Sequence, residues 1–508
     1  MLSKIYSLAV LGLDGYIVQV ETDFGTGVFS ISIVGLPDTA VKESRDRVTS
    51  AIKNSGFKHP RCRVTVNLAP ADIKKEGPAY DLPIALGILA SQGIVRESSL
   101  KDYAMIGELS LDGSIKPVNG VLPMCLCARR AGFKGVILPN KNSDEGALVQ
   151  GLDIISASSL NEIIDFLNSG NTIKPHVVDI KKVLPDEPTY NADFADVKGQ
   201  AHVKRALEIA ASGGHNIVMV GPPGSGKTML AKRLPTIMPS LSLEEALEIT
   251  KLYSVAGLLP SKGSLINIRP FRSPHHSISY AGLVGGGSVP QPGEISLAHL
   301  GVLFLDELPE FRRDVLEVLR QPLEDGVVTI SRALTSITYP ARFMLVAAMN
   351  PCPCGHFSDS LKGCTCTPFQ IQRYWSKLSG PLIDRIDLHV EVPRLKQDEL
   401  TKHPTGEPSK EIRKRVSFAR KIQRERFKKE KIFSNAEMNV RQIKEYCSLG
   451  KDAEELLKAA ILQLKMSARA YDRILKVART IADLEGSETI KAAHIAEATQ
   501  YRSLDRKS

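Results

Sequence analysis

The stretch Gly221-Pro-Pro-Gly-Ser-Gly-Lys-Thr228 decides the fold of the central part of this 508-residue chain. An apolar segment at 216–220 comes directly before it, and a helix is expected to begin near Lys227. Glycines in such a loop let backbone N–H groups turn inward around phosphates, and the helix amino terminus adds partial positive charge. The pattern therefore predicts a nucleotide site made of Gly221, Pro222, Pro223, Gly224, Ser225, Gly226, Lys227 and Thr228.

Two carboxylates complete the expected chemistry of this site. Asp306 and Glu307 end the apolar segment 302–305, and open α/β sheets bind ligands at the carboxyl ends of their strands. Lys227 is expected to reach the β- and γ-phosphates, while Thr228 and Asp306 would hold Mg²⁺. Glu307 would orient and polarise the attacking water. A solvated strand end is the alternative interpretation of the two carboxylates.

A third apolar segment, 344–348, is followed by Asn350, whose amide can hydrogen-bond the γ-phosphate or the water. This ordered set of loop, Asp-Glu strand and Asn-ended strand resembles the AAA+ ATPases. Within them it is similar to the branch shared by magnesium-chelatase ATPase subunits and MCM helicases. The resemblance to the ComM/YifB family of magnesium-chelatase-like proteins covers nearly the whole chain. It is carried by stretches such as Val197-Lys-Gly-Gln200, Arg269-Pro-Phe-Arg-Ser-Pro-His-His276, Asn350-Pro-Cys-Pro-Cys-Gly355 and Gly380-Pro-Leu-Ile-Asp-Arg-Ile-Asp387.

The resemblance implies a ring, normally a homohexamer, with ATP and Mg²⁺ bound between subunits. It assigns Arg385 as the finger that enters a neighbour's site and stabilises charge on the transferring phosphoryl group. It assigns Arg469 as the lid arginine of the helical part, with Arg473, one turn later, as a rival. Without the family, all three would be interpreted as surface arginines.

The amino-terminal part resembles the Lon protease domain through 67–81 and 106–113. Lon chemistry needs a serine nucleophile and a lysine that deprotonates it. In register, the serine position holds Ala79 and the lysine position holds Leu122, and neither side chain can do this work. We therefore expect a retained scaffold without peptidase activity.

The expected fold class is α/β and multidomain. Residues 1–170 form an inactive Lon-protease-like α/β domain and 171–188 a linker; 189–392 form the AAA+ P-loop NTPase core with a Cys-rich insertion at 352–366. Residues 393–508 form a basic connection and a C-terminal helical lid domain. The composition, 43% apolar and 24% charged, is typical of soluble globular protein and excludes wholesale disorder.

Four of the eight cysteines cluster within the insertion and could form a tetrahedral four-thiolate zinc site. The Cys-x-Cys spacing is less diagnostic than Cys-x-x-Cys, so reduced buried thiols and redox chemistry are alternatives, and His356 is a substitute ligand. The pair His275-His276 is open to a metal role or to a polar core or channel role. The clustered cysteines are Cys352, Cys354, Cys364 and Cys366.

Basic residues suggest a polyanionic partner. Net charge is +10, and 410–431 holds eleven basic and three acidic residues. This stripe is either a solvated helix face or a surface for a phosphate backbone. Alternation over 328–339 predicts a β-hairpin with Arg332 at the position where MCM proteins carry a basic residue in the ring channel. A plain surface hairpin is the alternative.

Three functions are compared. The family resemblance implies an ATP-dependent DNA translocase or helicase that promotes branch migration of recombination intermediates in natural transformation, or competence. The alternative is a chelatase-type motor that remodels a protein partner for Mg²⁺ insertion. A protease regulator is disfavoured by Ala79 and Leu122. With no apolar run of about 18–20 residues and no secretory signal, a cytoplasmic protein without a membrane partner is expected.

Overall fold

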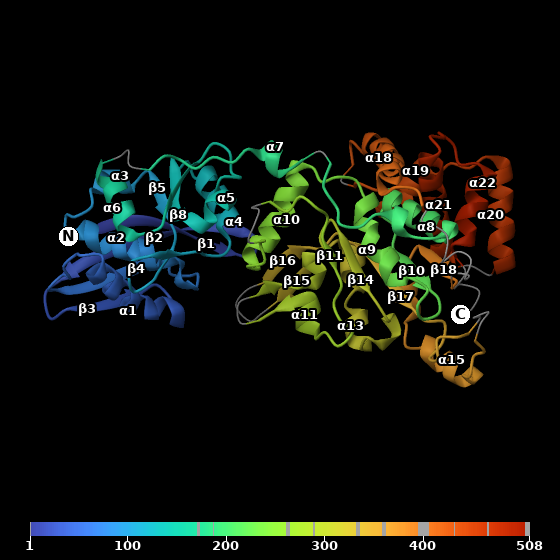
Figure 1. Cartoon of the computed structure of the whole chain (residues 1–508), viewed down its shortest axis with the longest axis horizontal. Helices are drawn as coiled ribbons and strands as arrows, with labels where there is room; N and C mark the ends of the chain where they lie inside the picture. The colour runs from blue at the N-terminus through green and yellow to red at the C-terminus, as the bar shows by residue number, and fades with distance from the viewer. Residues whose placement is uncertain are drawn as a thin grey trace. The chain divides into compact units, whose positions relative to one another are not determined.

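The computed structural model of the protein describes residues 2–169, 173–185, 187–260, 265–287, 290–331, 336–357, 362–394, 406–430, 432–464 and 467–502. They form two compact units, each with its own sheet (Figure 1). The first unit contains 1–185 and 243–267, and the second contains 186–242 and 268–508. No helix among the described residues is both long and apolar enough to cross a membrane.

The first unit is built on a seven-stranded sheet in the order β3-β4-β2-β1-β5-β8-β9. β1 and β2 pair antiparallel, as do β2 and β4, while the remaining neighbours are parallel. The strands are β1 (Ser3–Leu11), β2 (Asp14–Gly25), β3 (Ser30–Val34), β4 (Arg63–Ala69), β5 (Tyr103–Met105), β8 (Gly135–Pro139) and β9 (Asp153–Ala157), with β6 (Glu108–Leu109) and β7 (Ile115–Lys116) in a separate ladder.

The helices of this unit include one that is buried along its whole length. All residues of α2 (Asp81–Ser91) are buried, because the nonpolar run 82–90 leaves no polar face for water and the Asp81 carboxylate is paired with Arg47. This accounts for the apolar run that begins at Leu82. The other helices are α1 (Thr39–Asn54), α3 (Glu97–Leu100), α4 (Val121–Arg130), α5 (Ser143–Gly146), α6 (Leu160–Ser169), α7 (Ile180–Val183) and α10 (Leu243–Val255).

α10 follows the phosphate loop in sequence, yet it belongs to the first unit. Its Ser254 hydroxyl donates to the buried carboxylate of Glu145, and the Ser254 carbonyl accepts from the Gly120 N–H at 3.1 Å. The sequence ranges placed 243–267 within the central domain, whereas the structure groups these residues with the first unit. Nothing in the local sequence of α10 indicates this, because its partners lie more than a hundred residues earlier in the chain.

The second unit has a five-stranded parallel sheet in the order β11-β14-β17-β10-β18. The predicted strands at 217–220, 302–305 and 344–348 are all confirmed as central members of this sheet. Its strands are β10 (Ile217–Val220), β11 (Phe271–Arg272), β14 (Val302–Leu305), β17 (Met344–Met349) and β18 (Leu388–Glu391), and two small ladders pair β12 (Gly285–Gly286) with β13 (Gln291–Pro292) and β15 (Val327–Ser331) with β16 (Ser336–Pro340).

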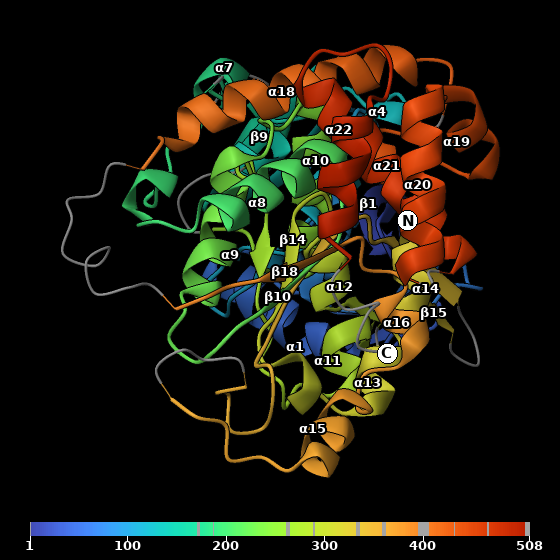
Figure 2. The same cartoon turned by 90° about the vertical axis from the view of Figure 1, so that its right-hand side faces the viewer.

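Helices cover this sheet, and the C-terminal ones share its core. Figure 2 shows α18 to α22 gathered at one end of the unit and α15 at the other. Val416, Phe427 and Ile474 from the C-terminal helices pack in one hydrophobic cluster with strand residues. The helices are α8 (Ala201–Gly213), α9 (Lys227–Ile237), α11 (Tyr280–Val284), α12 (Glu294–Leu297), α13 (Arg313–Glu317), α14 (Arg320–Asp325), α15 (Pro368–Trp375), α16 (Gly380–Ile383), α18 (Ser409–Arg426), α19 (Val440–Tyr446), α20 (Lys451–Leu464), α21 (Ala468–Leu484) and α22 (Ala492–Gln500).

Candidate functional site

The phosphate loop connects the end of β10 to the start of α9 at Lys227, as predicted. A β-carbon on Gly221 would lie 2.2 Å from the Val392 carbonyl oxygen, so only glycine lets the loop leave the sheet along this path. β10 lies beside β17, which in turn lies beside β14. Because all three run parallel, their carboxyl ends bring Asp306 and Asn350 to the same edge as the loop.

A pocket of about 430 Å³ opens at this edge, within the size range of small-molecule sites. Every residue of the predicted loop from Pro223 onward contributes to its lining, together with both predicted carboxylates and the predicted asparagine. The lining consists of Pro223, Gly224, Ser225, Gly226, Lys227, Thr228, Met229, Asp306, Glu307, Met349 and Asn350.

Lys227 is held at the floor of the pocket. Its ammonium group donates to the carbonyl oxygens of Gly221 at 2.7 Å and Pro222 at 3.0 Å, and to Oδ1 of Asn350 at 3.3 Å. Burial lowers the pKa of Lys227, an effect that the nearby Asp306 and Glu307 oppose. The three oxygen acceptors of Lys227 are all neutral. Phosphate oxygens would replace them when nucleotide binds, because an ammonium ion forms a stronger hydrogen bond with an anionic oxygen than with a neutral carbonyl oxygen.

Thr228 and Asp306 form an oxygen pair suited to Mg²⁺. The Thr228 hydroxyl donates to Oδ2 of Asp306 at 2.7 Å, so the two ligands already lie side by side. Magnesium prefers hard oxygen ligands and usually uses one or two protein groups together with substrate phosphates and water. The donor set therefore fits Mg²⁺, which Thr228 and Asp306 would hold and which would neutralise charge on bound phosphates.

Glu307 has a left-handed backbone conformation, with φ of 54°. This conformation is uncommon for a residue other than glycine and is found where the surrounding structure holds a functional side chain in place. Its N–H donates to Oδ1 of Asp306 at 3.0 Å, and its carboxylate lies 3.6 Å from Nδ1 of His276. The Glu307 side chain is 56% exposed, which leaves it accessible to water.

We expect Glu307→Gln to bind nucleotide normally and to lower the turnover rate by about 10²–10⁴, the usual worth of a general base. The amide keeps the size of the side chain but cannot polarise water. Isothermal titration with ATP and a steady-state phosphate-release assay measure the two properties separately. The control is Glu310→Gln, because Glu310 pairs with Lys377 at 3.2 Å and does not line the pocket. Turnover by Glu307→Gln at the wild-type rate would remove Glu307 from the chemistry.

Two contacts of the site were not predicted from sequence. Nε2 of Gln200 donates to the carbonyl oxygen of Ser225 at 2.7 Å and so supports the phosphate loop from below. The sequence leaves His276 open to a metal, polar core or channel role, and in the structure its Nδ1 lies 3.6 Å from the Glu307 carboxylate. Both belong to stretches that carry the family resemblance. No local pattern assigns them a role, because their partners are distant in sequence.

The three arginines suggested for catalysis lie at the opposite edge of the same sheet. Arg385 precedes β18, and its backbone carbonyl accepts from Nδ2 of Asn216 just before β10. Arg469 lies 3.5 Å from Asp384, and Arg473 pairs with Asp387. This is the amino-terminal edge of β18, whereas the pocket lies at the carboxyl-terminal edge of β10. Four strand residues, about 13 Å, separate the two edges.

A buried network fixes the helix that carries Arg469 and Arg473. Nδ1 of His215 lies 3.1 Å from Oδ2 of Asp387, and its Nε2 lies 2.8 Å from the Thr480 hydroxyl in α21. Burial raises the pKa of Asp387, but the Arg473 cation and the His215 bond outweigh it, and the carboxyl pKa ends well below its usual range. Burial lowers the pKa of His215, so a neutral imidazole bridges the sheet and the helix.

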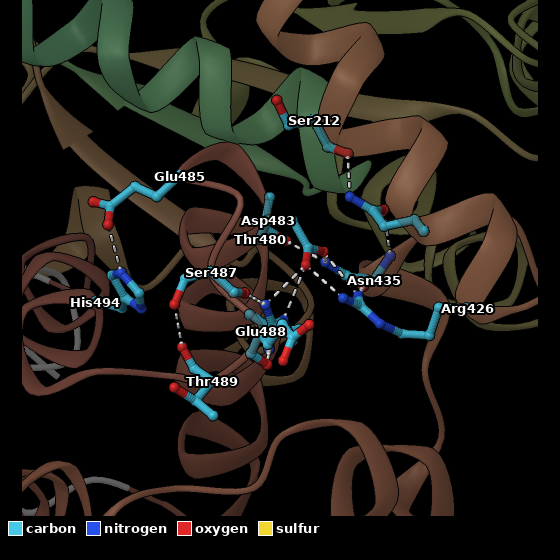
Figure 3. A network of polar contacts seen from close by, with 12 residues as sticks. Ser212, Arg426, Asn435, Thr480, Asp483, Glu485, Ser487, Glu488, Thr489 and His494 are labelled. Atoms are coloured by element: carbon cyan, nitrogen blue, oxygen red, sulfur yellow. Dashed lines mark hydrogen bonds and ion pairs between the residues drawn. The ribbon is translucent and has the colours of Figure 1, made fainter.

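Figure 3 shows the continuation of this network, in which Arg426 and Asn435 both donate hydrogen bonds to Asp483. Asn435 also donates to Thr480 at 3.0 Å, and Arg426 donates to Asp483 at 2.8 Å. α18, α21 and the sheet edge are therefore joined by continuous buried hydrogen bonds. Breaking one partner of such a buried pair typically costs about 3–5 kcal/mol, so this edge is rigid.

Comparison with known proteins agrees with this geometry. The pattern of the family described as "Magnesium chelatase, subunit ChlI" matches 193–400, that of "Subunit ChlI of Mg-chelatase" matches 20–142, and that of "Magnesium chelatase, subunit ChlI C-terminal" matches 406–502. Competence protein ComM of Haemophilus influenzae is 45% identical over 509 residues, which cover 99% of this chain and 98% of that protein. The chain belongs to the ComM/YifB family of magnesium-chelatase-like proteins.

Two further relatives match this chain, one over nearly its whole length and one over a part of it. Uncharacterized protein YifB of Salmonella typhimurium is 45% identical over 507 residues, 99% of this chain and 98% of that protein. Lon protease 2 of Bacillus subtilis is 31% identical over 145 residues, 28% of this chain and 26% of that protein. The mixed α/β structure with its parallel sheet is consistent with a P-loop fold of the AAA+ type.

Ala79 and Leu122, the residues expected at the serine and lysine positions of the Lon resemblance, have nonpolar side chains. Ala79 makes a backbone contact, its carbonyl accepting from the Gly107 N–H at 3.0 Å. Leu122 is fully buried, and its N–H donates to Oε1 of Glu145 at 2.8 Å. Burial raises the pKa of Glu145, and its hydrogen bonds oppose the shift. The carboxylate of Glu145 thus caps α4 beside Leu122 and anchors α10 through Ser254.

The four cysteines predicted as a zinc site come together in the structure. Their sulfur atoms all lie within 4.8 Å of one another. Sγ of Cys352 is 3.3 Å from that of Cys354 and 3.7 Å from that of Cys364, and Cys354 and Cys364 are 3.6 Å apart. A tetrahedral zinc with four thiolates has sulfur–sulfur edges of about 3.8 Å. These distances fit Zn²⁺ and are too long for disulfides.

Two elements were predicted to contact DNA, the hairpin at 328–339 and the basic stripe at 410–431. The hairpin is confirmed as β15–β16, but Arg332, the residue expected to contact DNA, lies outside the described residues. In α18, several cations of the basic stripe have internal partners: Arg415 pairs with Glu208 and Glu407, and Arg426 with Asp483. This part of the stripe supports the packing of the helix rather than a nucleic-acid surface.

Proposed function

We propose that this protein is an ATP-hydrolysing ring, normally a homohexamer, that moves along DNA and promotes branch migration of recombination intermediates, as in competence. The observation that carries the proposal is the separation between the pocket and the three arginines. Lys227 is the only cationic side chain among the described residues that line the pocket. A triphosphate carries more negative charge than one lysine and one Mg²⁺ balance, so further cations must come from elsewhere.

A neighbouring subunit is the proposed source of these cations. Arg385, Arg469 and Arg473 cannot reach the pocket of their own chain, because a side chain of about 7 Å does not span the roughly 13 Å between the sheet edges. A head-to-tail arrangement brings the arginine edge of one subunit to the pocket of the next, and closing such contacts by rotation generates a ring. Arg469 is 66% exposed, whereas Arg473 is committed to a buried pair, so we assign Arg469 as the lid arginine.

The hairpin is the proposed point of contact with DNA. It lies in the chain between Glu307 and Asn350, and its second strand leads through a short connection into β17, which ends directly before Asn350. One face is buried, and the other carries hydroxyl pairs, Thr329 with Thr338 at 3.1 Å and Ser331 with Ser336 at 3.2 Å. Hydroxyl groups commonly donate to phosphate oxygens, and a tip cation would add affinity without reading sequence.

The alternative is a chelatase-type motor that remodels a protein partner for Mg²⁺ insertion. The family patterns named for the ChlI subunit favour it. The name of the relative ComM and the net charge of +10 favour DNA. The two proposals differ in one measurable way, because only the first requires nucleotide turnover to respond to a polynucleotide.

We expect single-stranded and branched DNA to raise the ATPase rate of the full chain severalfold. The rate is measured with single-stranded, duplex and four-way DNA at 50 and 200 mM salt, and the stimulation should fall steeply between these concentrations. Arg332→Ala should keep basal turnover and lose the stimulation. The control is Lys458→Ala, which removes the same charge from an exposed residue paired with Glu454 in α20. Stimulation that persists in Arg332→Ala would reject the hairpin, and a wild-type rate indifferent to all DNA would favour the alternative.

The four cysteines are proposed to bind Zn²⁺ as a structural ion. Backbone N–H groups donate to the sulfurs: Phe357 to Cys352 at 3.3 Å, Cys354 to Cys366 at 3.4 Å and Cys366 to Cys364 at 3.4 Å. Donors of this kind stabilise thiolates, the form in which cysteine binds a metal. Four protein ligands leave no open position, as in structural rather than catalytic zinc sites.

A further inference from the structure

We infer that the zinc-binding cluster is a support of the nucleotide pocket, so that zinc occupancy sets the affinity of the phosphate loop for nucleotide. The inference rests on the proposed nucleotide and zinc sites and adds a coupling between them. It is carried by contacts of Gly355, Asn350 and Trp375, which connect the cysteine cluster to the pocket within the second unit.

The first connection is covalent and short. Asn350 accepts a hydrogen bond from Nζ of Lys227 at 3.3 Å, and Cys352 follows it by two residues. Cys352 is fully buried, and its sulfur lies 3.3 Å from that of Cys354 and 3.7 Å from that of Cys364. A metal that holds the Cys352 sulfur therefore also restricts the position of the Asn350 amide, since only Pro351 separates them.

The second connection is a direct contact between the cluster and the phosphate loop. Gly355, in the turn after Cys354, lies so close to the Pro223 ring that an added β-carbon would be 2.6 Å from its Cδ and 2.7 Å from its Cγ. The same β-carbon would be 3.8 Å from Cγ of Asn350. With φ of 82°, Gly355 also has a conformation that L-residues rarely adopt. The turn therefore rests on the phosphate loop, and glycine is required for this approach.

The third connection holds residues 350–351 against α15. Nε1 of Trp375 in α15 donates to the Pro351 carbonyl oxygen at 3.1 Å. The neighbouring Tyr374 is 6% exposed, and its phenol oxygen is hydrogen-bonded to the Asn350 backbone. Residues 350–355 are thus held between α15 and the phosphate loop. The cysteine cluster brings sulfurs from both arms of the insertion within 4.8 Å of one another, so a bound Zn²⁺ would cross-link the two arms.

Loss of the ion removes the cross-link between the two arms of the insertion. Four neighbouring thiolates would then repel one another, or take up protons and separate, and the Gly355 turn would no longer be pressed against Pro223. The loop would sample more conformations before nucleotide binds, which lowers affinity because ordering it costs free energy. The coupling acts on binding, so it is measured without following turnover.

The chain has a single tryptophan, and it is located at this junction. Energy transfer from Trp375 to N-methylanthraniloyl-ADP therefore reports binding from beside the pocket. Zinc is removed from the full chain with a thiol-directed mercurial and a chelator, the mercurial is reversed with excess thiol, and Mg²⁺ is restored. We expect one zinc per wild-type chain by elemental analysis, and an increase of about tenfold in the Kd for the labelled ADP after removal. Added Zn²⁺ should restore the original Kd.

Two glycine variants distinguish the effect of the Gly355 contact on nucleotide affinity from the effect of losing zinc. Gly355→Ala should keep its zinc and raise the Kd about tenfold, because the methyl group displaces Pro223. Gly363→Ala, in the same insertion with nothing within 4 Å of the added carbon, should match wild type in zinc content and Kd. If Gly355→Ala loses its zinc, the stripped wild-type protein gives the deciding comparison.

Three results would overturn the inference, and they are distinguishable from one another. An unchanged Kd in zinc-free wild type, or in zinc-loaded Gly355→Ala, rejects the coupling while leaving the nucleotide site intact. Wild-type chains purified under reducing conditions without zinc, and unable to take it up, reject the metal site. Failure of wild-type protein to bind the labelled ADP at all rejects the proposed function itself.

Discussion

Replacement of Lys227 by alanine is expected to abolish measurable nucleotide turnover, a loss of at least about 10³ in kcat/KM. Among the described residues that line the pocket, the ammonium group is the one cation, and its present acceptors are two loop carbonyls and the Asn350 amide. Without it, the β- and γ-phosphates face Asp306 and Glu307 with no cationic side chain among the described residues that line the pocket. Binding should weaken as well, since the lysine contributes in the ground state.

Phosphate release and ADP titration measure the two effects of Lys227→Ala. The matched control is Lys232→Ala, which removes an exposed lysine from the same helix, α9, away from the pocket. A circular-dichroism melt confirms that both variants are folded. Turnover by Lys227→Ala within about tenfold of wild type would mean that this pocket is not where nucleotide is hydrolysed.

Arg385→Ala is expected to bind ATP like wild type and to lose about 10³-fold or more in turnover, the usual worth of an arginine finger. In the single chain this side chain is 9% exposed, pairs with Glu324 and donates to the Pro381 carbonyl oxygen at 2.6 Å. We propose that Arg385 exchanges Glu324 for a neighbour's phosphoryl group during turnover. The exchange is feasible because the Glu324 side chain is 58% exposed and readily solvated.

A second variant distinguishes this role from support of the fold. Glu324→Gln breaks the same ion pair but keeps Arg385, so it should turn over ATP at least as fast as wild type. Should Glu324→Gln lose activity to the same extent as Arg385→Ala, the ion pair itself, and not transfer of the arginine to a neighbour, would explain the loss. Sedimentation shows whether both variants still assemble.

The nucleotide pocket was predictable because its parts are encoded locally. β10, β14 and β17 are short apolar strands, each followed directly by site residues, and parallel strands place such residues at one edge. Local sequence did not predict that α10 belongs to the first unit. Its sequence is amphipathic like that of many helices, and its contact with Glu145 depends on a partner 109 residues away.

The stripe in α18 shows why charge patterns are ambiguous without coordinates. Eleven basic residues over 410–431 are typical of a solvated or polyanion-binding face. In the structure Arg415 reaches Glu208, and Arg426 reaches Asp483, at separations of 207 and 57 residues. Such pairs are invisible to any local window. The position of Arg385 at the far edge of the sheet was equally hidden, because it depends on the parallel register of β10 and β18.

The central claim is that each nucleotide pocket is half of a site and that the arginine edge of a neighbour completes it. Mixing Lys227→Ala with Arg385→Ala chains tests this claim directly. In a mixed ring, an Arg385→Ala subunit offers an intact pocket to the intact Arg385 of a Lys227→Ala neighbour. Random mixing at equal amounts then leaves about a quarter of the interfaces complete. The account predicts that two inactive proteins recover turnover together, up to about this fraction of the wild-type rate. Mixed assemblies that form, exchange subunits and remain inactive would contradict it.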